Sequence, residues 1–489
     1  MKQLYTLRRT LSAIILLLVS ALPCMATMFK VDGIKYRVNE NDEIVSVSVV
    51  RNTPSYSGDI VIPSTVTYEG TTYSVTSIVR ETFKGCTSIT SISLPESVTS
   101  IGDWAFYGCT SLTSISLPKS VTSIGVSVFE GCTSLTSISL PEGVTSIEMG
   151  VFSGCTSLTS ISLPESVTSI EMGVFSGCTS LTSISIPKSV TSIENSVFLG
   201  CTSLTSIIVS PDNTVYDSRE GCNAIIETST NTLIVGCKST IIPEGVTSIG
   251  SEAFKGCTSL TSMFIPESVT SIGDMAFRYC TSLTTISIPE GVTSIGWYAF
   301  CECTSLTSIS LPESMTSIGD RAFEICTSLT SISLPEGVTS IGEYTFSNCT
   351  SLTSISLPES LTSIGEYAFN RCTSLTTIVC RAKEVPELST DVFLNVPQSE
   401  ATLYVPSSSI EAYRAAEQWK DFGKILPLEE YTTGIDSPTA VGADTGVYDV
   451  YTIRGTLIRK GCNSHNLNGL PAGAYILRHG NESKTVVKR

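Results

Sequence analysis

Apolar and polar residues along this chain follow a unit of 23 residues that recurs many times. In the copy from Cys109 to Gly131, the apolar residues Leu112, Ile115 and Leu117 come first, with a serine on either side of Ile115. Successive side chains of a strand point to opposite faces, so Ile115 and Leu117 are predicted to face a core and the serines to face solvent. The proline after Leu117 cannot donate to a ladder, so the strand should end there.

A second group of apolar residues follows the proline in each copy. In the same copy, Val121 and Ile124 begin a return segment, and Val128 and Phe129 are predicted to fill the far side of a coil. No single copy can bury this much apolar surface, but stacked copies can, because each covers its neighbours. A fixed period of this length is typical of a solenoid. Copies of the unit begin at Cys86, Cys109, Cys132, Cys155, Cys178, Cys201, Cys257, Cys280, Cys303, Cys326, Cys349 and Cys372.

The spacing LxxIxL inside the unit is that of a leucine-rich repeat. We therefore predict a right-handed leucine-rich-repeat solenoid with a parallel β-sheet, capped at both ends and followed by a small all-β module. The predicted segments are, in order, a signal peptide (1–26), an N-terminal cap (27–85), the solenoid (86–379) with an enlarged irregular coil (209–242), a C-terminal cap (380–431) with a helix (410–419), a linker (432–445) and the β module (446–489).

The first 26 residues have the order of a secretory signal. Three basic residues and no acid precede an apolar run from Leu11 to Val19, which is too short to span a membrane. Small residues at Cys24 and Ala26 predict cleavage after Ala26. A lipoprotein attached through Cys24 is the alternative, although Pro23 fits that motif poorly. No other stretch of the sequence is long and apolar enough to be a transmembrane segment.

The period is interrupted once, by ten extra residues within 209–242. The runs Ala224–Ile226 and Leu233–Val235 are predicted to form two strands of a hairpin, with turn residues between them. Cys222 and Cys237 flank this hairpin, so they are either a disulfide in an oxidising compartment or two free thiols.

One repeat position alternates between glycine and glutamate. Gly125 follows Thr-Ser-Ile in one copy, and Glu148 takes the same place in the next. A glutamate with positive φ would be strained, so this position is not expected to need the left-handed conformation.

Charge limits the partners that the chain can have. The net charge is −16, and −19 once the three basic residues of the signal are removed. Binding to nucleic acid or to an anionic membrane needs clustered Lys and Arg, so neither is expected as a partner.

The sequence gives little support to metal binding or catalysis. The twelve cysteines at one repeat position are expected to pack as a column of buried thiols, with no His near them for a metal site. The two histidines, His465 and His479, lie in the last 30 residues, so none can activate a serine of the solenoid. We therefore expect neither an enzyme nor a cofactor.

The outward residues of the strands are the candidate binding face. A continuous surface of hydroxyls suits broad, multivalent contact with a partner. The alternative is that these serines have no binding role and are simply small polar residues that tolerate exposure. Ile208 and Phe264 replace serines on either side of the irregular coil, where we expect an apolar binding patch. The candidate residues are Ser114, Ser116, Ser137, Ser139, Ser160, Ser162, Ser183, Ser185, Ile208, Phe264, Ser287, Ser310, Ser333 and Ser356.

The unit CxxLxxIxLPxxVxxIGxxAF resembles the BspA-like leucine-rich-repeat surface proteins of Bacteroidetes and related bacteria. The run Leu403–Pro406, the pair Ala412–Tyr413 and the residues from Trp419 to Phe422 are also similar to that family. The resemblance covers about residues 55–430 and implies a surface-displayed protein of the kind commonly assigned to adhesion or host-protein binding. It supplies no motif of binding residues.

The tail is similar to the C-terminal sorting domains of type IX secretion substrates. The residues that carry this resemblance are Val447–Asp449, Gly455, Leu470–Ile476 and Val486–Arg489. It implies translocation across an outer membrane and removal of the tail on attachment to the cell surface.

The function that we expect is adhesion or protein–protein interaction through the strand face, by an exported protein at the cell surface or outside the cell. Its partners would be host matrix proteins or the surface of neighbouring cells. The alternative is a structural spacer or surface-layer component without a specific ligand. The sequence leaves the oligomeric state open.

Overall fold

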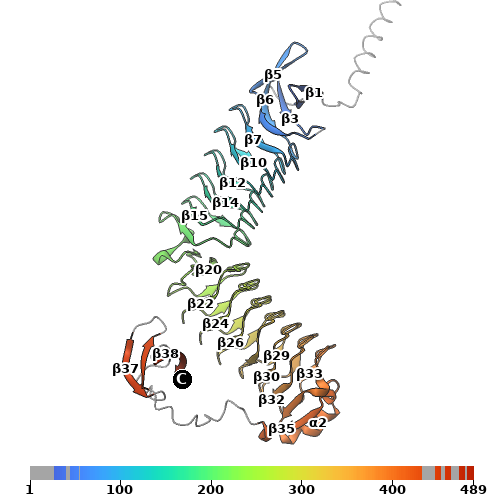
Figure 1. Ribbon diagram of the computed structural model, residues 1–489, viewed down its shortest axis with the longest axis vertical. Coiled ribbons are helices and arrows are strands. Elements are labelled where there is room, and N and C mark those ends of the chain that lie inside the picture. Colours follow the sequence, from blue (N-terminus) through green and yellow to red (C-terminus); the bar gives the residue numbers. More distant parts are fainter. Residues whose placement is uncertain are drawn as a thin grey trace, which may run out of the picture. The chain divides into compact units, whose positions relative to one another are not determined.

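The computed structural model describes residues 27–39, 45–53 and 55–431, together with the backbone of 447–452, 457–463, 473–479 and 482–488. Two compact units divide the chain, Met1–Leu428 and Glu429–Arg489. The predicted signal peptide and linker lie outside the described residues. Figure 1 shows the first unit as a stack of short coils, each carrying strands that lie beside those of the next coil.

A row of parallel strands runs along one side of the coils, and its outward surface is the strand face. Neighbouring strands pair one repeat apart, as Ile138 does with Ile161. The strands of this row are β4 (Gly58–Val61), β7 (Ile89–Ser93), β9 (Ser114–Ser116), β11 (Ser137–Ser139), β13 (Ser160–Ser162), β15 (Ser183–Ile186), β17 (Ser206–Val209), β22 (Ser262–Phe264), β24 (Thr285–Ser287), β26 (Ser308–Ser310), β28 (Ser331–Ser333), β30 (Ser354–Leu357), β32 (Thr377–Cys380), β34 (Thr402–Val405) and β35 (Lys424–Pro427).

A second row of shorter strands is formed mainly by the Ser-Ile pair of each Thr-Ser-Ile. Most of the isoleucines pair with that of the next coil, as Ile272 does with Ile295. The repeat strands of this second row are β8 (Ser100–Ile101), β10 (Ser123–Ile124), β12 (Ser146–Ile147), β14 (Ser169–Ile170), β16 (Ser192–Ile193), β21 (Ser248–Ile249), β23 (Ser271–Ile272), β25 (Ser294–Ile295), β27 (Ser317–Ile318), β29 (Ser340–Ile341), β31 (Ser363–Ile364) and β33 (Glu387–Leu388).

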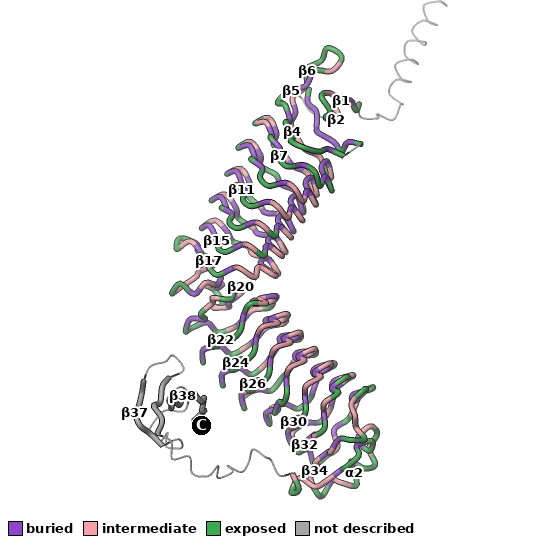
Figure 2. Tube along the Cα trace, in the orientation of Figure 1, coloured by how far each residue is buried: buried purple, intermediate pink, exposed green. Residues whose placement is uncertain are grey.

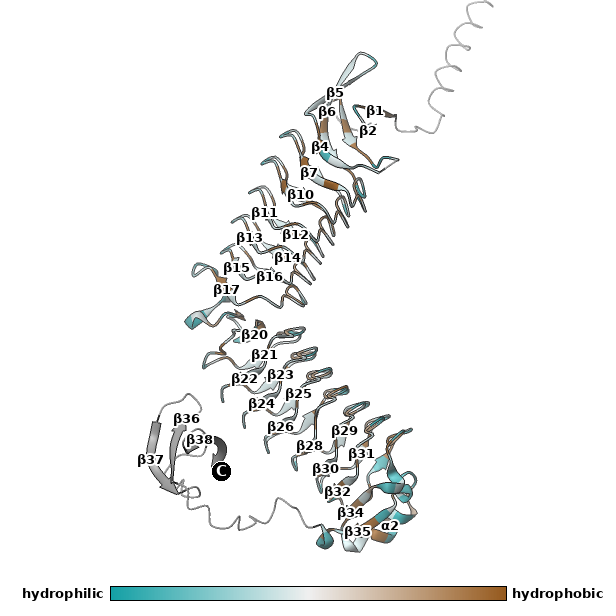
Figure 3. Cartoon of the chain, viewed as in Figure 1, coloured by the Kyte–Doolittle hydropathy of each residue, from teal (hydrophilic) through white to brown (hydrophobic). Residues whose placement is uncertain are grey.

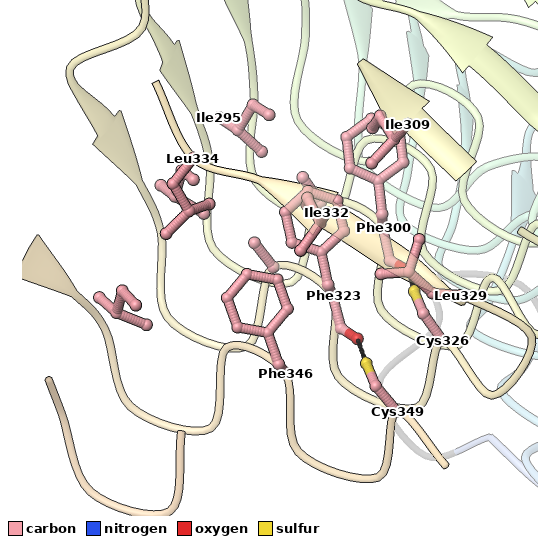
Figure 4. Close-up of a cluster of buried hydrophobic side chains, with 14 of the residues drawn as sticks. Ile295, Phe300, Ile309, Phe323, Cys326, Leu329, Ile332, Leu334, Phe346 and Cys349 are labelled. Atoms are coloured by element: carbon pink, nitrogen blue, oxygen red, sulfur yellow. Dashed lines mark hydrogen bonds between the residues drawn. The ribbon is translucent and has the colours of Figure 1, made fainter. Parts of the chain in front are cut away.

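The core lies between the two rows and the turn that follows the second one. The residues predicted to face inward do so: Leu112 and Phe129 are fully buried, and Ile115 is 7% exposed. Figure 2 shows buried positions recurring from coil to coil. On each side of the irregular coil the phenylalanines stack from coil to coil, and the centre of the Phe323 ring lies 5.6 Å from those of both Phe300 and Phe346 (Figure 4). This continuous contact between neighbours is what stacked copies need in order to bury their apolar residues.

The turn after the second row holds two residues per coil in the left-handed region. One position carries Ser127 (φ 51°) or Tyr298 (φ 55°), and the other carries Gly131 (φ 71°) or Glu302 (φ 62°). The position occupied by Gly125 or Glu148 has no positive φ, as expected from the sequence. Residues other than glycine cost roughly 1–2 kcal/mol in the left-handed region, so the coil-to-coil contacts must hold these turns in place.

The N-terminal strands build two hairpins onto the first coils. One is antiparallel, β1 (Met28–Val31), β2 (Ile34–Val38) and β3 (Ser46–Val49), and the other joins β5 (Thr65–Tyr68) to β6 (Thr71–Ile78). Strand β4 pairs in parallel with β7, and β6 with β8. Stacking of coils therefore begins before Cys86, within the segment predicted as the N-terminal cap.

The irregular coil forms three short strands, one more than the predicted hairpin. They are β18 (Tyr216–Asp217), β19 (Ile225–Glu227) and β20 (Thr232–Val235), with the 3-10 turn η1 (Arg219–Gly221) between the first two. These strands are antiparallel to one another, and β20 pairs in parallel with β21 of the second row. The buried apolar residues fall into two clusters, one reaching from Phe29 to Cys237 and the other from Cys222 to Ile425.

The end of the first unit contains the helix, which is shorter than predicted. Helix α2 covers Ile410–Ala415 rather than 410–419, because Ala416 is extended and Gln418 has a φ of 60°. This break lets Trp419 pack edge-on against Phe393, the last ring of the phenylalanine stack. The 3-10 turns of this region are η2 (Gln398–Glu400), η3 (Ser407–Ser409), η4 (Trp419–Asp421) and η5 (Leu428–Glu430). In Figure 3 the segments around α2 include strongly hydrophilic positions. A polar outer surface is expected at the end of a stack, because no further coil covers it.

The second unit contains four strands. They are β36 (Val447–Thr452), β37 (Leu457–Asn463), β38 (Gly473–His479) and β39 (Glu482–Lys488), and they form one antiparallel sheet in the order β37-β36-β38-β39. No helix within the described residues has the length and apolar character needed to cross a membrane.

Candidate functional site

The strand face presents the serine ladders to solvent. The serines at both ends of β9, β11 and β13 are exposed and the isoleucine between them is buried. Ser137 lies opposite Ser114 on one side and Ser160 on the other, so the hydroxyls form rows that run across the coils. Among the candidate serines only Ser356 is partly buried, and it accepts a hydrogen bond from Arg381.

Ile208 and Phe264 are the exposed large apolar residues of this face beside the irregular coil, and Val61, opposite Ser93, is another near the N-terminal end of the row. The exposed fractions of Ile208 and Phe264 are 55% and 51%. Ile208 lies opposite Ser185 on β15, and Phe264 lies opposite Ser287 on β24. Each of these two side chains therefore occupies the position next to the end of a row of serine hydroxyls.

The strand face is interrupted between β17 and β22. Strand β17 pairs only with β15, and β22 only with β24, among the strands that the structure describes. The ladder of threonine amides shows the same interruption: the Thr205 N–H donates to the Thr182 carbonyl, and the series resumes with Thr284 donating to Thr261. The irregular coil causes the break because its strands join the second row instead. Ile208 and Phe264 thus lie on the two strands that end at the break.

The coils on either side of the break still touch at their turns. The Ser259 hydroxyl donates to the Thr202 carbonyl over 3.3 Å, and the Ser196 hydroxyl forms a short hydrogen bond with Glu252. Within the described part of the chain, however, no ring contact joins Phe198 to Phe254, so the phenylalanine stack stops here as well. At the break, therefore, the turns of the two coils remain in contact, whereas the strands β17 and β22 do not pair with each other.

The repeated cysteines are free thiols, most of them buried, as the sequence predicts. The Cys349 thiol donates to the Phe323 carbonyl over 3.2 Å (Figure 4), and the same bond recurs along the column. Burial raises the pKa of Cys132 and of Cys372 to about 12. Such thiols stay protonated and unreactive at neutral pH, which fits a packing role.

Cys222 and Cys237 are also free thiols in the structure, so the disulfide alternative is not what the structure has. The first belongs to the C-terminal apolar cluster and the second to the N-terminal one. Among the described residues, no group of three or more His, Cys, Asp or Glu could hold a metal ion. His465 lies outside the described residues, as does the side chain of His479.

Sequence reasoning missed one feature of the surface, a groove along the second row between Ser251 and Gly342. The signal was present in the repeat position that alternates between glycine and glutamate. The groove lies where this position is glycine in successive coils. Trp297, at the next repeat position, is 46% exposed.

Stacked coils with one long strand face and a buried column of phenylalanines define a leucine-rich-repeat solenoid. The chain belongs to the family described as the BspA type leucine rich repeat region, whose model matches six copies over residues 64–150, 125–231, 225–326 and 293–414. This match confirms the resemblance of the repeat unit to the BspA-like leucine-rich-repeat proteins.

Solved structures of bacterial repeat proteins are similar to this chain. A leucine rich cell surface protein from Faecalibacterium prausnitzii is 31% identical with a TM-score of 0.56, covering 76% of this chain and 96% of its own. A leucine-rich repeat protein from Bacteroides ovatus is 32% identical with a TM-score of 0.50, covering 74% of this chain and 99% of its own. The pneumococcal vaccine antigen PcpA, at 20% identity and a TM-score of 0.60 over 82% and 98% of the two chains, shares the fold. No curated protein was found to match the chain.

Proposed function

We propose that this protein is exported to the cell surface and binds other proteins through the strand face. The observation that carries the proposal is the break between β17 and β22, where Ile208 and Phe264 stand exposed at the ends of two serine rows. Large apolar side chains surrounded by small polar ones match the usual arrangement of a binding hot spot. Host matrix proteins or the surface proteins of neighbouring cells are the partners that we propose.

The surface location rests on three lines of support. The Faecalibacterium protein is described as a cell surface protein. Residues 1–26 have the order of a signal peptide, and the C-terminal residues are similar to a type IX sorting domain. Export by that route places the solenoid outside the cell. The direct test is labelling of intact cells with an antibody against the solenoid, before and after deletion of residues 446–489.

The binding test uses the full chain on a panel of immobilised extracellular-matrix proteins. The double variant Ile208→Asp/Phe264→Asp should lose about tenfold or more in affinity for a bound partner, because each hot-spot residue typically contributes more than 1 kcal/mol. The matched control is Met149→Asp/Met172→Asp, which changes two side chains of similar exposure, 43% and 51%, away from the strand face. Equal losses in the two double variants would contradict the assignment of the strand face.

A structural spacer or surface-layer component is the second candidate. It would need no partner, so failure of the wild-type chain to bind any protein of the panel or any cell surface would favour it. The near-identical copies that begin at Cys132 and Cys155 fit this role, since added copies lengthen a solenoid without changing its frame.

A further inference from the structure

The second row carries an open groove that is separate from the strand face. It has a volume of about 640 Å³ and runs over the coils from Ser251 to Gly342. Four neighbouring repeat positions line it: the serine and isoleucine of Thr-Ser-Ile, the glycine that follows them, and the residue after that glycine. The last of these positions carries Asp274, Trp297 and Asp320 in three consecutive coils. These residues lie in the turns of neighbouring coils, so Trp297 has an aspartate on the coil at each side.

The glycine column explains why the groove occurs in this block. A Cβ added at Gly296 would lie 2.5 Å from the Asp274 backbone nitrogen, and one at Gly319 would lie 2.4 Å from that of Trp297. The coils therefore approach each other too closely for a larger residue at these positions. In the first block the same position holds glycine in two copies, Gly102 and Gly125, and glutamate in the next three, Glu148, Glu171 and Glu194.

Hydrogen bonds between coils hold the two carboxylates in place. Asp274 Oδ1 accepts the Trp297 backbone N–H over 3.0 Å, and Asp320 Oδ1 accepts the Glu343 N–H over 2.9 Å. Among the described residues neither carboxylate forms an ion pair. Both negative charges, and the second oxygen of each carboxylate, remain available to a ligand.

The indole of Trp297 has no cation of its own. It packs edge-on against Tyr298 at 5.3 Å, and no Lys or Arg of the described residues lies over its ring. The nearby guanidinium groups are engaged elsewhere: Arg278 lies 4.8 Å from the Tyr298 ring, and Arg321 lies 4.0 Å from the Tyr344 ring.

Another indole, Trp104, lies on the same turn of an earlier coil, one repeat position later than Trp297, in the column that carries Tyr298 in the second block. The Arg80 guanidinium lies 4.2 Å from the centre of the Trp104 ring, and Lys84 Nζ lies 5.6 Å from it. Trp is the aromatic residue that attracts cations most strongly. The chain thus covers Trp104 with its own cations and leaves Trp297 open between two carboxylates.

We propose that this groove binds a basic segment of a partner polypeptide, with a Lys or Arg side chain over Trp297 and its charge between Asp274 and Asp320. The net charge of −16 adds long-range attraction for such a segment. A neutral glycan would also stack on an indole and donate its hydroxyls to the carboxylates, but it would leave both negative charges without a cation. The proposal is independent of the strand face, which lies on the other row of strands.

The test titrates the full chain with a heptapeptide of alternating Gly and Lys, followed by tryptophan fluorescence and calorimetry. Trp419 is buried and Trp104 is covered, so the fluorescence response should come from Trp297. Trp297→Ala and the pair Asp274→Asn/Asp320→Asn should each weaken binding by about tenfold, and added salt should weaken it in the wild-type chain. Thermal unfolding of each variant checks that it is folded.

The matched control removes the same number of charges from the first block, as Glu148→Gln/Glu171→Gln. If this pair weakens binding as much as the aspartate pair does, the peptide binds to net charge alone and the proposal is overturned. Binding of a neutral hexasaccharide that is lost in Trp297→Ala, with no binding of the Gly-Lys peptide, would assign the groove to carbohydrate instead. Loss of peptide binding in Ile208→Asp/Phe264→Asp but not in Trp297→Ala would move the site to the strand face.

Discussion

Replacing Phe323 by alanine should unfold the C-terminal part of the stack at a much lower urea concentration. Phe323 is fully buried, and its ring lies 5.6 Å from the rings of both neighbouring coils. Removing a buried phenylalanine ring leaves a cavity and costs about 3–5 kcal/mol. We expect about 4 kcal/mol here, because coils that contact only their neighbours have no other residues to close the gap.

Phe264→Ala is the matched control, because it is the same chemical change at a residue that is 51% exposed. Its expected cost is about 1 kcal/mol or less, since little packing is lost at the surface of a strand. The comparison separates the effect of burial from that of losing the residue itself. Similar costs for the two variants would refute the assignment of the phenylalanine column to the core.

Tryptophan fluorescence can follow urea unfolding separately on the two sides of the break. Trp104 belongs to the coils before the break and Trp419 to the end of the stack, so two single-tryptophan chains report on the two sides. Because the phenylalanine stack and the threonine ladder both stop at the break, Phe323→Ala should shift the urea midpoint seen by Trp419 and leave that seen by Trp104 in place. An equal shift at both reporters would show that the irregular coil transmits stability across the break.

Two further predictions concern the thiol column and the close contact of the coils. Burial raises the pKa of Cys132 and Cys178 from 9.0 to about 12, so the folded chain keeps thiol protons that the unfolded chain loses above about pH 9. The free energy of unfolding should therefore fall as pH rises from about 9 towards 12, by about 1.4 kcal/mol per pH unit for each such thiol, and a melting temperature that stays constant to pH 11 would contradict this. Gly319→Ala should cost about 1–3 kcal/mol because its Cβ would meet backbone atoms of the preceding coil at 2.4 Å, whereas Gly85→Ala, which has open space, should cost about 1 kcal/mol for its φ of 69°. Urea unfolding of the two variants checks the order, and a smaller cost for Gly319→Ala would show that the coils can separate.

The repeat made most of the frame predictable from the sequence. Leu112, Ile115 and Phe129 are buried, and the serines around Ile115 are exposed. The same pattern of apolar and polar positions recurs in every coil, so a correct interpretation of one copy applies to the others. The position of Gly125 was also read correctly, since Glu148 at the same place rules out a general need for positive φ.

The parts that escaped prediction depend on contacts that no local pattern encodes. Tyr298 and Glu302 adopt positive φ although neither residue favours it, because hydrogen bonds between coils impose the turn. Helix α2 ends early because Trp419 packs against Phe393, a residue far away in the sequence. The groove was missed for a related reason, since it exists only when several coils carry glycine at one position.

Two adjacent repeat positions must change together to create such a groove on this frame. Met149 and Met172 hold the place of Trp297 in the first block and are similarly exposed, so packing does not dictate the residue there. The first block also lacks the carboxylates, because Met149 and Asn195 stand on the coils beside Met172. A second site of the proposed kind would therefore need glycine in place of Glu148, Glu171 and Glu194 and an aspartate on each side of Met172→Trp, so Met172→Trp alone should not bind the Gly-Lys peptide. In the groove that we propose, the binding residues thus come from paired columns, while the phenylalanine and leucine columns keep the coils in register.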